Sequence, residues 1–193
     1  MEICLASNNQ HKIEELKQLL GNHILLKTLS EIGCNEDIEE TGSTFEENSK
    51  IKSDFVFNKF KINCLSDDSG LEIDALEGRP GVYSARYSGI HGDHPSNIRK
   101  VLEELKGVEN RAARFRTVIS LNLEGETIQF DGVVEGKINF GPAGTDGFGY
   151  DPIFIPLGYE TTFAQMSSDE KNKISHRAEA IKKLVDYLKD KKK

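Results

Sequence analysis

An α/β or α+β protein built on a mixed β-sheet is the fold that the sequence predicts. Near its start, the apolar run 3–6 reads as a strand, and apolar residues at helical spacing over 13–20 follow it, an order typical of parallel sheets. Further along, alternating apolar residues over 115–123 and a second run over 127–135 flank Glu124-Gly125-Glu126, which predicts a long antiparallel hairpin. Parallel and antiparallel signals in one chain indicate a mixed sheet.

The other elements follow from similar signals. A second strand is predicted over 24–29, and a helix from Thr44 to Phe60. An amphipathic helix over 93–105 and a short strand over 153–155 come next. The last helical region opens with Ser167-x-x-Glu170, the spacing of a capping box.

Composition limits the classes of function. The 193 residues, 37% of them hydrophobic, predict a single domain over 1–193, with room for a smaller lobe. A net charge of −7 argues against non-specific binding along a nucleic acid, although a local basic pocket can still bind phosphates. No signal peptide or membrane span is predicted, so we expect a cytoplasmic protein with no membrane partner. Three cysteines without C-x-x-C spacing indicate reduced thiols rather than zinc ligands or disulfides.

The junction between the first predicted strand and helix is polar. A helix start exposes backbone N–H groups, and the surrounding donors would make a cradle for phosphate. Plain N-capping by Asn8 or Asn9, with a solvated Lys12, explains the same residues equally well. The residues of this loop are Ser7, Asn8, Asn9, Gln10, His11 and Lys12.

Lys52 lies on the inward face of the helix predicted from Thr44. At about 100° per residue it shares a stripe with Phe45, Ser49 and Val56, whereas Lys50 does not. An inward lysine either extends its ammonium to the surface or neutralises an acid or anion in a partly buried site, because an unpaired buried ammonium is costly.

Asp67 and Asp68 end an apolar run that reads as a strand. Adjacent side chains on a strand point to opposite faces, so one carboxylate should face a ligand and the other should be structural. Asp68-Ser69-Gly70 also has the composition of a turn, and from this stretch alone an ordinary turn is the preferred interpretation.

Two later segments suggest a nucleotide. Glycines flank Phe148 in the loop 141–152, where a backbone can approach a ligand closely and the ring can stack on a base; a tight structural loop is the alternative. In the C-terminal region, we expect a helix break at Ser175 that places His176 and Arg177 in the first turn of a new helix. Cations there oppose the helix dipole unless an anion is present, and a surface His-Arg pair is the alternative.

Six motifs, in order, resemble one family across nearly the whole chain. The family is the inosine triphosphate pyrophosphatases, also called non-canonical purine nucleoside triphosphate pyrophosphatases. The motifs are Ser7-x-Asn9-x-x-Lys12 followed by Glu15, Glu39-Glu40-Thr41-Gly42-x-Thr44-Phe45-x-Glu47-Asn48, Asp67-Asp68-Ser69-Gly70-Leu71, Pro80-Gly81-Val82-Tyr83-Ser84-Ala85-Arg86-Tyr87, Gly147-Phe148-Gly149-Tyr150-Asp151-Pro152, and Ser175-His176-Arg177.

This resemblance implies a fold and an activity. The fold would be α/β, with an elongated mixed β-sheet flanked by helices and two lobes around a central cleft, usually in a homodimer. The activity would be Mg²⁺-dependent hydrolysis of ITP, dITP and XTP to the monophosphate and pyrophosphate. A Maf-type pyrophosphatase with other nucleotide preferences and a non-catalytic nucleotide sensor are the alternatives.

The resemblance also implies residue roles. Asp68 would be the catalytic acid and a metal ligand, Glu40 would help hold the metal, and Lys52 would neutralise developing charge. The loop from Ser7 to Lys12 would contact phosphates. Further substrate contacts would come from Ser69, Phe148, Gly149, Tyr150, Asp151, Lys171, His176 and Arg177. The chain departs from the family at Asn8 and at Asp146, where glycine is usual; asparagine tolerates positive φ, so the loop geometry can survive at Asn8. Asp67 would then be the structural support of Asp68.

Overall fold

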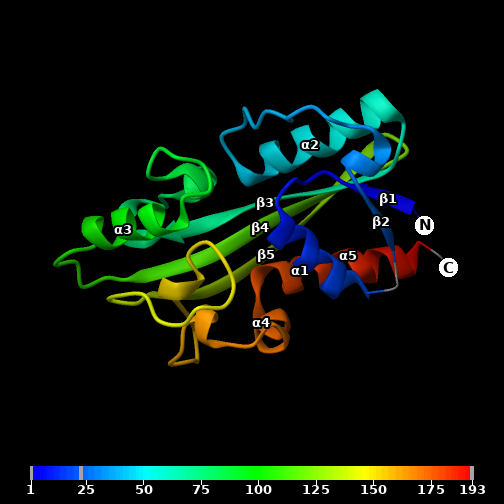
Figure 1. Cartoon of the computed structure of the whole chain (residues 1–193). Coiled ribbons are helices and arrows are strands. Elements are labelled where there is room, and N and C mark those ends of the chain that lie inside the picture. The colour runs from blue at the N-terminus through cyan, green and yellow to red at the C-terminus, as the bar shows by residue number, and fades with distance from the viewer. Residues whose placement is uncertain (1, 22–23, 192–193) are drawn as a thin grey trace. The chain divides into compact units, whose positions relative to one another are not determined.

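A computed structural model describes residues 2–21 and 24–191, so residues 1, 22–23 and 192–193 lie outside it. Six strands form one sheet in the order β2-β1-β3-β4-β5-β6 (Figure 1). β1 is parallel to β2 and to β3, whereas β5 and β6 are antiparallel, so the mixed sheet of an α/β protein is confirmed. The strands are β1 (Glu2–Leu5), β2 (Leu25–Thr28), β3 (Cys64–Ile73), β4 (Ala112–Leu123), β5 (Glu126–Ile138) and β6 (Phe154–Pro156). The helices are α1 (Gln10–Leu20), α2 (Phe45–Phe60), α3 (His94–Glu104), α4 (Ser168–Ile174) and α5 (His176–Asp190).

The chain divides into two compact units. The first comprises Met1–Asp68, Thr117–Gly132 and Arg177–Lys193, and the second comprises Ser69–Arg116 and Val133–His176. The divisions fall within β3, β4 and β5 and at the start of α5. An elongated single domain with two lobes around a cleft stays a prediction.

In the first unit, the strand pleat separates two cores. Ile3 and Leu5 of β1 and Leu65 of β3 pack with α1 and α5. Cys4 and Cys64, which are register partners on these strands, face the opposite way and pack with α2. α2 thus covers one face of this part of the sheet while α1 and α5 cover the other (Figure 1). This is the alternation expected of extended strands buried on both faces.

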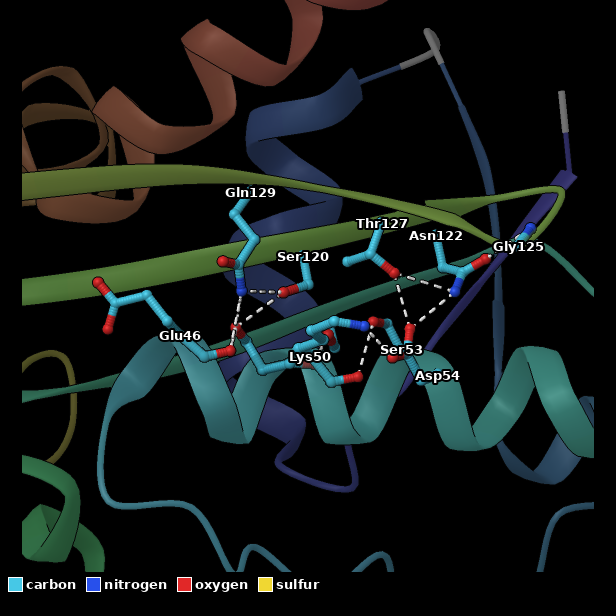
Figure 2. A network of polar contacts seen from close by, with 11 residues as sticks. Glu46, Lys50, Ser53, Asp54, Ser120, Asn122, Gly125, Thr127 and Gln129 are labelled. Carbon is cyan, nitrogen blue, oxygen red and sulfur yellow. Dashed lines mark hydrogen bonds and ion pairs between the residues drawn. The ribbon is translucent and has the colours of Figure 1, made fainter.

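The contact between α2 and the strands is unusually polar. Ser49 and Ser120 share a hydrogen bond of 2.8 Å. The amide of Gln129 donates to the Glu46 carbonyl at 2.8 Å (Figure 2). Further along the helix, Asn122 and Thr127 both donate to Asp54, at 2.8 and 2.7 Å. Buried polar groups are tolerated when they have partners, and here their directed bonds also fix the helix against β4 and β5.

The second unit has its own aromatic core. Phe115 of β4, Phe154 of β6 and Phe163 lie with ring centroids 4.6 to 6.0 Å apart. Val101 of α3 and Leu71 of β3 are buried in the same cluster. This core supports the glycine-rich loop that precedes β6.

Most predicted elements are confirmed. The helix from Thr44 is α2, with Thr44 as its N-cap, and the region over 93–105 forms α3, capped by Asp93. The hairpin is present as β4 and β5, and the helix break at Ser175 separates α4 from α5. The predicted second strand is shorter, over Leu25–Thr28, and the last begins at Phe154 rather than Ile153. No helix in 2–21 or 24–191 combines the length and apolar character needed to cross a membrane.

The predicted turn at Asp68-Ser69-Gly70 is wrong. β3 continues from Cys64 to Ile73 without interruption, and Gly70 does not have positive φ. Polar residues resemble a turn in the sequence, but here they remain in a strand because other elements supply them with partners. Ser66, for example, donates to the Ser49 carbonyl at 2.5 Å, and the Asp68 carbonyl accepts from Thr117 at 3.2 Å.

We predict that Asn122→Ala lowers the free energy of unfolding by about 1–3 kcal/mol, because it leaves part of the Asp54 and Gly125 bonding unmet in a buried position. Urea unfolding followed by circular dichroism measures the change. The exposed Asn35 is the matched control, and Asn35→Ala should stay within about 0.5 kcal/mol of the parent protein. An equal effect of both substitutions would contradict the role given to the polar contact with α2.

Candidate functional site

Asp67 anchors two helices to β3. Its side chain is 1% exposed, and its Oδ2 lies 3.0 Å from the Lys12 ammonium and 3.5 Å from Nε of Arg177. Arg177 also pairs with Glu15 at 2.8 Å. Burial alone would raise the pKa of Asp67, but the charges of Lys12, Arg177 and Lys52 hold this pKa well below its ordinary value. The carboxylate of Asp67 therefore ties α1 and the start of α5 to the strand.

Asp68 points the other way, toward α2. Its Oδ2 accepts a hydrogen bond of 3.0 Å from the Asn48 amide, and the residue is 6% exposed. Burial raises the pKa of Asp68, and the nearby charge of Glu40 adds to this rise, while Lys52 and Lys12 oppose it; the net direction is upward. The two neighbouring aspartates thus have opposite surroundings because the strand pleat sends them to opposite faces.

Lys52 is buried, as its helical stripe predicts, and it neutralises an acid rather than reaching solvent. Its ammonium pairs with Glu40 and donates to the Asp67 carbonyl at 2.7 Å. Burial lowers the pKa of Lys52, but Asp68, Glu40 and Asp67 outweigh it and raise the pKa. The Glu40 pKa is lowered, since Lys52 outweighs the effect of burial. Lys52 therefore remains a cation beside two carboxylates.

The loop before α1 is both a helix cap and a group of donors. Asn9 is the N-cap, and its side chain accepts from the Lys12 backbone N–H at 3.2 Å, while its own N–H donates to Ser7 at 3.2 Å. N-capping is therefore observed, and the partly exposed Lys12 pairs with Asp67 instead of extending freely into solvent. The exposed residues of the loop are Asn8, Asn9, Gln10 and His11.

In the second unit, Asp151 organises the glycine loop. Its Oδ2 accepts from the Phe148 backbone N–H at 2.9 Å and pairs with Lys171 at 2.7 Å. The Lys171 ammonium also lies 5.1 Å from the centre of the Phe148 ring. Gly147 has φ +74°, and a Cβ there would lie 2.1 Å from the Asp151 carboxylate, so a side chain at this position would displace that carboxylate. The backbone and ring of Phe148 are thus held by one buried ion pair.

The other residues predicted to contact substrate differ in burial and in the groups that they contact. Tyr150 is buried, and its hydroxyl donates to the Ser84 carbonyl at 2.8 Å, so its side chain serves the core. His176 is buried and stacks on Phe115, with centroids 5.0 Å apart and 13° between the rings. Ser69 is half-buried in β3, and Gly149 has φ +63° in the loop.

Arg177 has its anions within the protein. The helix start was expected to need an anion beside this cation, and the carboxylates of Glu15 and Asp67 fill that need. Carboxylates from α1 and β3 therefore offset the unfavourable position of the Arg177 cation at the N-terminus of α5. The presence of a cation at this helix start is then not by itself evidence for a bound phosphate.

Two groups of predicted residues emerge. The first unit brings together Lys12, Glu40, Lys52 and Asp68, and the second brings together Phe148, Asp151 and Lys171. Sequence reasoning gave no role to Glu15 or Asn48. The sequence feature that could have revealed Asn48 is its spacing from Lys52. Asn48 lies one helical turn before Lys52, so both side chains are on the inward face of α2.

The carboxylates of Glu40 and Asp68 suit a hard cation. The residues at 2–21 and 24–191 contain no cluster of three or more histidine, cysteine or acidic side chains that could hold a metal by themselves. Mg²⁺, however, commonly uses one or two carboxylates together with substrate phosphates and water. A cation would also relieve the mutual repulsion of Glu40 and Asp68. The residues present therefore fit Mg²⁺ held jointly with a phosphate ligand.

Comparisons with known proteins place the chain in a family. The model of the Ham1 family matches residues 3–187. A dITP/XTP pyrophosphatase of Christiangramia forsetii is 52% identical over 188 residues, covering 97% of this chain and 99% of its own. One of the same name from Bacillus subtilis is 51% identical over 191 residues, covering 97% and 96%. The solved structure of the Staphylococcus aureus Ham1 protein has a TM-score of 0.91 and 43% identity, covering 99% of this chain and all of that one. The chain belongs to the Ham1 family.

We predict that Asp67→Asn costs about 3–5 kcal/mol of unfolding free energy, because it removes the buried carboxylate that faces the partly buried Lys12 and the buried Arg177. Asp131, which pairs with Lys183 at the surface, is the control. Asp131→Asn should cost at most about 1 kcal/mol. Denaturant unfolding of both variants tests the comparison, and similar small losses would mean that Asp67 does not anchor the helices.

Proposed function

We propose that the protein hydrolyses non-canonical purine nucleoside triphosphates, namely dITP, XTP and ITP, to the monophosphate and pyrophosphate with the help of Mg²⁺. The observation that carries this proposal is the charged group of Lys12, Glu40, Lys52 and Asp68, set in a chain about half identical to relatives named dITP/XTP pyrophosphatase. An enzyme that removes such nucleotides would cleanse the nucleotide pool.

The triphosphate would be bound by the cations of the first unit. The ammonium groups of Lys12 and Lys52 pair with Asp67 and Glu40, and both would neutralise charge that develops on the phosphates. The donors of the loop from Ser7 to His11 would contact phosphate oxygens at the start of α1. When bound, Mg²⁺ would supply positive charge to phosphate oxygens and would be held by Glu40 and Asp68.

Asp68 would act on the attacking water. Its carboxylate is held by Asn48 on the face opposite to Asp67, and it would orient a water toward the α-phosphorus and accept its proton. Cleavage between the α- and β-phosphates then releases pyrophosphate and leaves the monophosphate. Asp67, committed to Lys12 and Arg177, would support this arrangement without touching the water.

Phe148 and its loop would recognise the base. Phe148 offers a stacking face whose position is fixed by Asp151 and Lys171. Donors from this loop and from His176 would bind the 6-oxo edge of hypoxanthine or xanthine. Adenine presents a 6-amino group there, and a site built to donate would leave that contact unmatched. Because Arg177 is held by Glu15 and Asp67, we assign it a supporting role.

The assembly and compartment are part of the same proposal. The family resemblance supports a homodimer. The three cysteines are free and buried, which suits a reducing compartment such as the cytoplasm. Light scattering of the purified protein tests the dimer, and a monomer across micromolar concentrations would refute it.

A pyrophosphate-release assay tests the activity. Purified protein with Mg²⁺ should release pyrophosphate from dITP, XTP and ITP, much more slowly from dATP, and not at all when EDTA removes the metal. Release of single phosphate would refute the proposal. Preference for pyrimidine nucleotides would instead indicate a Maf-type specificity, and binding without turnover would indicate a nucleotide sensor.

We predict that Asp68→Asn lowers kcat by about 10²–10⁴-fold, the range expected for loss of a positioned proton acceptor, while the protein still binds nucleotide. Asp67→Asn should show the converse, with a larger fall in melting temperature and a smaller loss of turnover. Melting curves, steady-state kinetics and calorimetric nucleotide binding on both variants separate these roles. An active Asp68→Asn enzyme would refute the assignment of the catalytic carboxylate.

A further inference from the structure

Asn48 uses both ends of its side-chain amide. The residue is fully buried at the start of α2, with an exposure of 0%. Its Nδ2 donates to Asp68 at 3.0 Å, and its Oδ1 accepts from the Gly42 backbone N–H at 2.8 Å. An amide offers a donor and an acceptor at fixed separation, so this one side chain sets the spacing between β3 and the loop before the helix.

The loop is held very close to the helix at Gly42. A Cβ at this position would lie 2.6 Å from the Glu47 Cβ and 2.7 Å from Oδ1 of Asn48. Such distances cannot be reached without moving the loop or the helix. The bond between Gly42 and Asn48 therefore depends on the absence of a side chain at residue 42.

Glu40 lies two residues before Gly42, so the same loop carries one of the two proposed metal ligands. Its carboxylate pairs with Lys52, which follows Asn48 by one helical turn. Ser43 is tied to α2 as well, since Glu47 accepts from its backbone N–H at 2.7 Å. The loop that carries Glu40 is thus attached to α2 through Glu40, Gly42 and Ser43, and Asn48, the partner of Gly42, also donates a hydrogen bond to the carboxylate of Asp68.

We propose that Asn48 is a positioning residue that holds the carboxylates of Glu40 and Asp68 at the spacing needed to share one Mg²⁺. This inference rests on the proposed function. Hydrogen-bonding partners of metal-binding carboxylates orient them, and their loss commonly costs about 10- to 100-fold in metal affinity or activity.

Asn122 provides a matched control. It is also a buried asparagine at the contact of α2 with the strands, and its Nδ2 donates to the carboxylate of Asp54 at 2.8 Å (Figure 2). Asp54 is no part of the proposed site. Asn122→Ala should therefore lower the melting temperature about as much as Asn48→Ala does, but it should not weaken metal binding.

The test compares Asn48→Ala, Asn122→Ala and the parent protein. For each we would measure melting temperature, kcat, KM for dITP at saturating metal, and the Mg²⁺ concentration that gives half-maximal activity. Mn²⁺ binding in the presence of a non-hydrolysable dITP analogue, followed by electron paramagnetic resonance, gives a readout independent of turnover. We expect Asn48→Ala to weaken Mn²⁺ binding and lower kcat by about 10- to 100-fold, with a smaller change in KM, whereas Asn122→Ala lowers only the melting temperature.

Gly42→Ala tests the same contact from the loop side and serves if Asn48→Ala does not fold. It should raise the half-maximal Mg²⁺ concentration, because displacement of the loop moves Glu40. Unchanged Mn²⁺ binding and kcat in the folded variants would overturn the inference and leave Asn48 a structural residue. If the parent protein releases no pyrophosphate, the proposed function is refuted. If the parent protein releases pyrophosphate and the variants equal it in Mn²⁺ binding and kcat, only the inference about Asn48 is refuted.

Discussion

The pleat of β3 is the constraint on which the candidate site depends. Along this strand Cys64, Ser66 and Asp68 face α2, while Leu65 and Asp67 face α1 and α5. Because the alternation is a property of any extended chain, two adjacent aspartates are given different environments with no distortion of the strand. One carboxylate is committed to Lys12 and Arg177, and the other is left beside Asn48, Glu40 and Lys52.

Burial makes each of these charges depend on its partners. An isolated buried charge costs several kcal/mol, so Lys52 is stable inside the protein because Glu40 and the Asp67 carbonyl receive it. In the proposed function, a nucleotide phosphate would replace Glu40 as the anion that faces this lysine. Polar contacts of α2 with β4 and β5 fix the helix that carries Asn48 and Lys52, so the proposed chemistry would depend on a helix that also stabilises the fold.

Much of the fold was predictable because its signals are local. Helical periodicity placed Lys52 on the inward side of α2, and the capping box and helix break near Ser175 were recognised from short motifs. The turn at Asp68 was mistaken because turn residues and polar strand residues have the same composition. Only partners distant in sequence, such as Asn48 and Thr117, keep these residues extended.

The sequence suggested candidate site residues, but it did not show the contacts that these residues make in the structure. The family motifs suggested Asp68 and Glu40 as site residues and helical spacing suggested Lys52, but no local pattern shows that Arg177 pairs with Glu15, which is 162 positions away in the chain. The role of Asn48 was missed for a similar reason, since its two partners, Gly42 and Asp68, come from different segments.

We propose that Asp68 faces the metal and that Asp67 does not. Mn²⁺ binding measured by electron paramagnetic resonance in the presence of a non-hydrolysable dITP analogue tests it directly, on Asp67→Asn and Asp68→Asn at a temperature where both are folded. We predict that Asp68→Asn loses the bound ion and that Asp67→Asn retains it. Equal loss in the two variants, or loss only in Asp67→Asn, would contradict it.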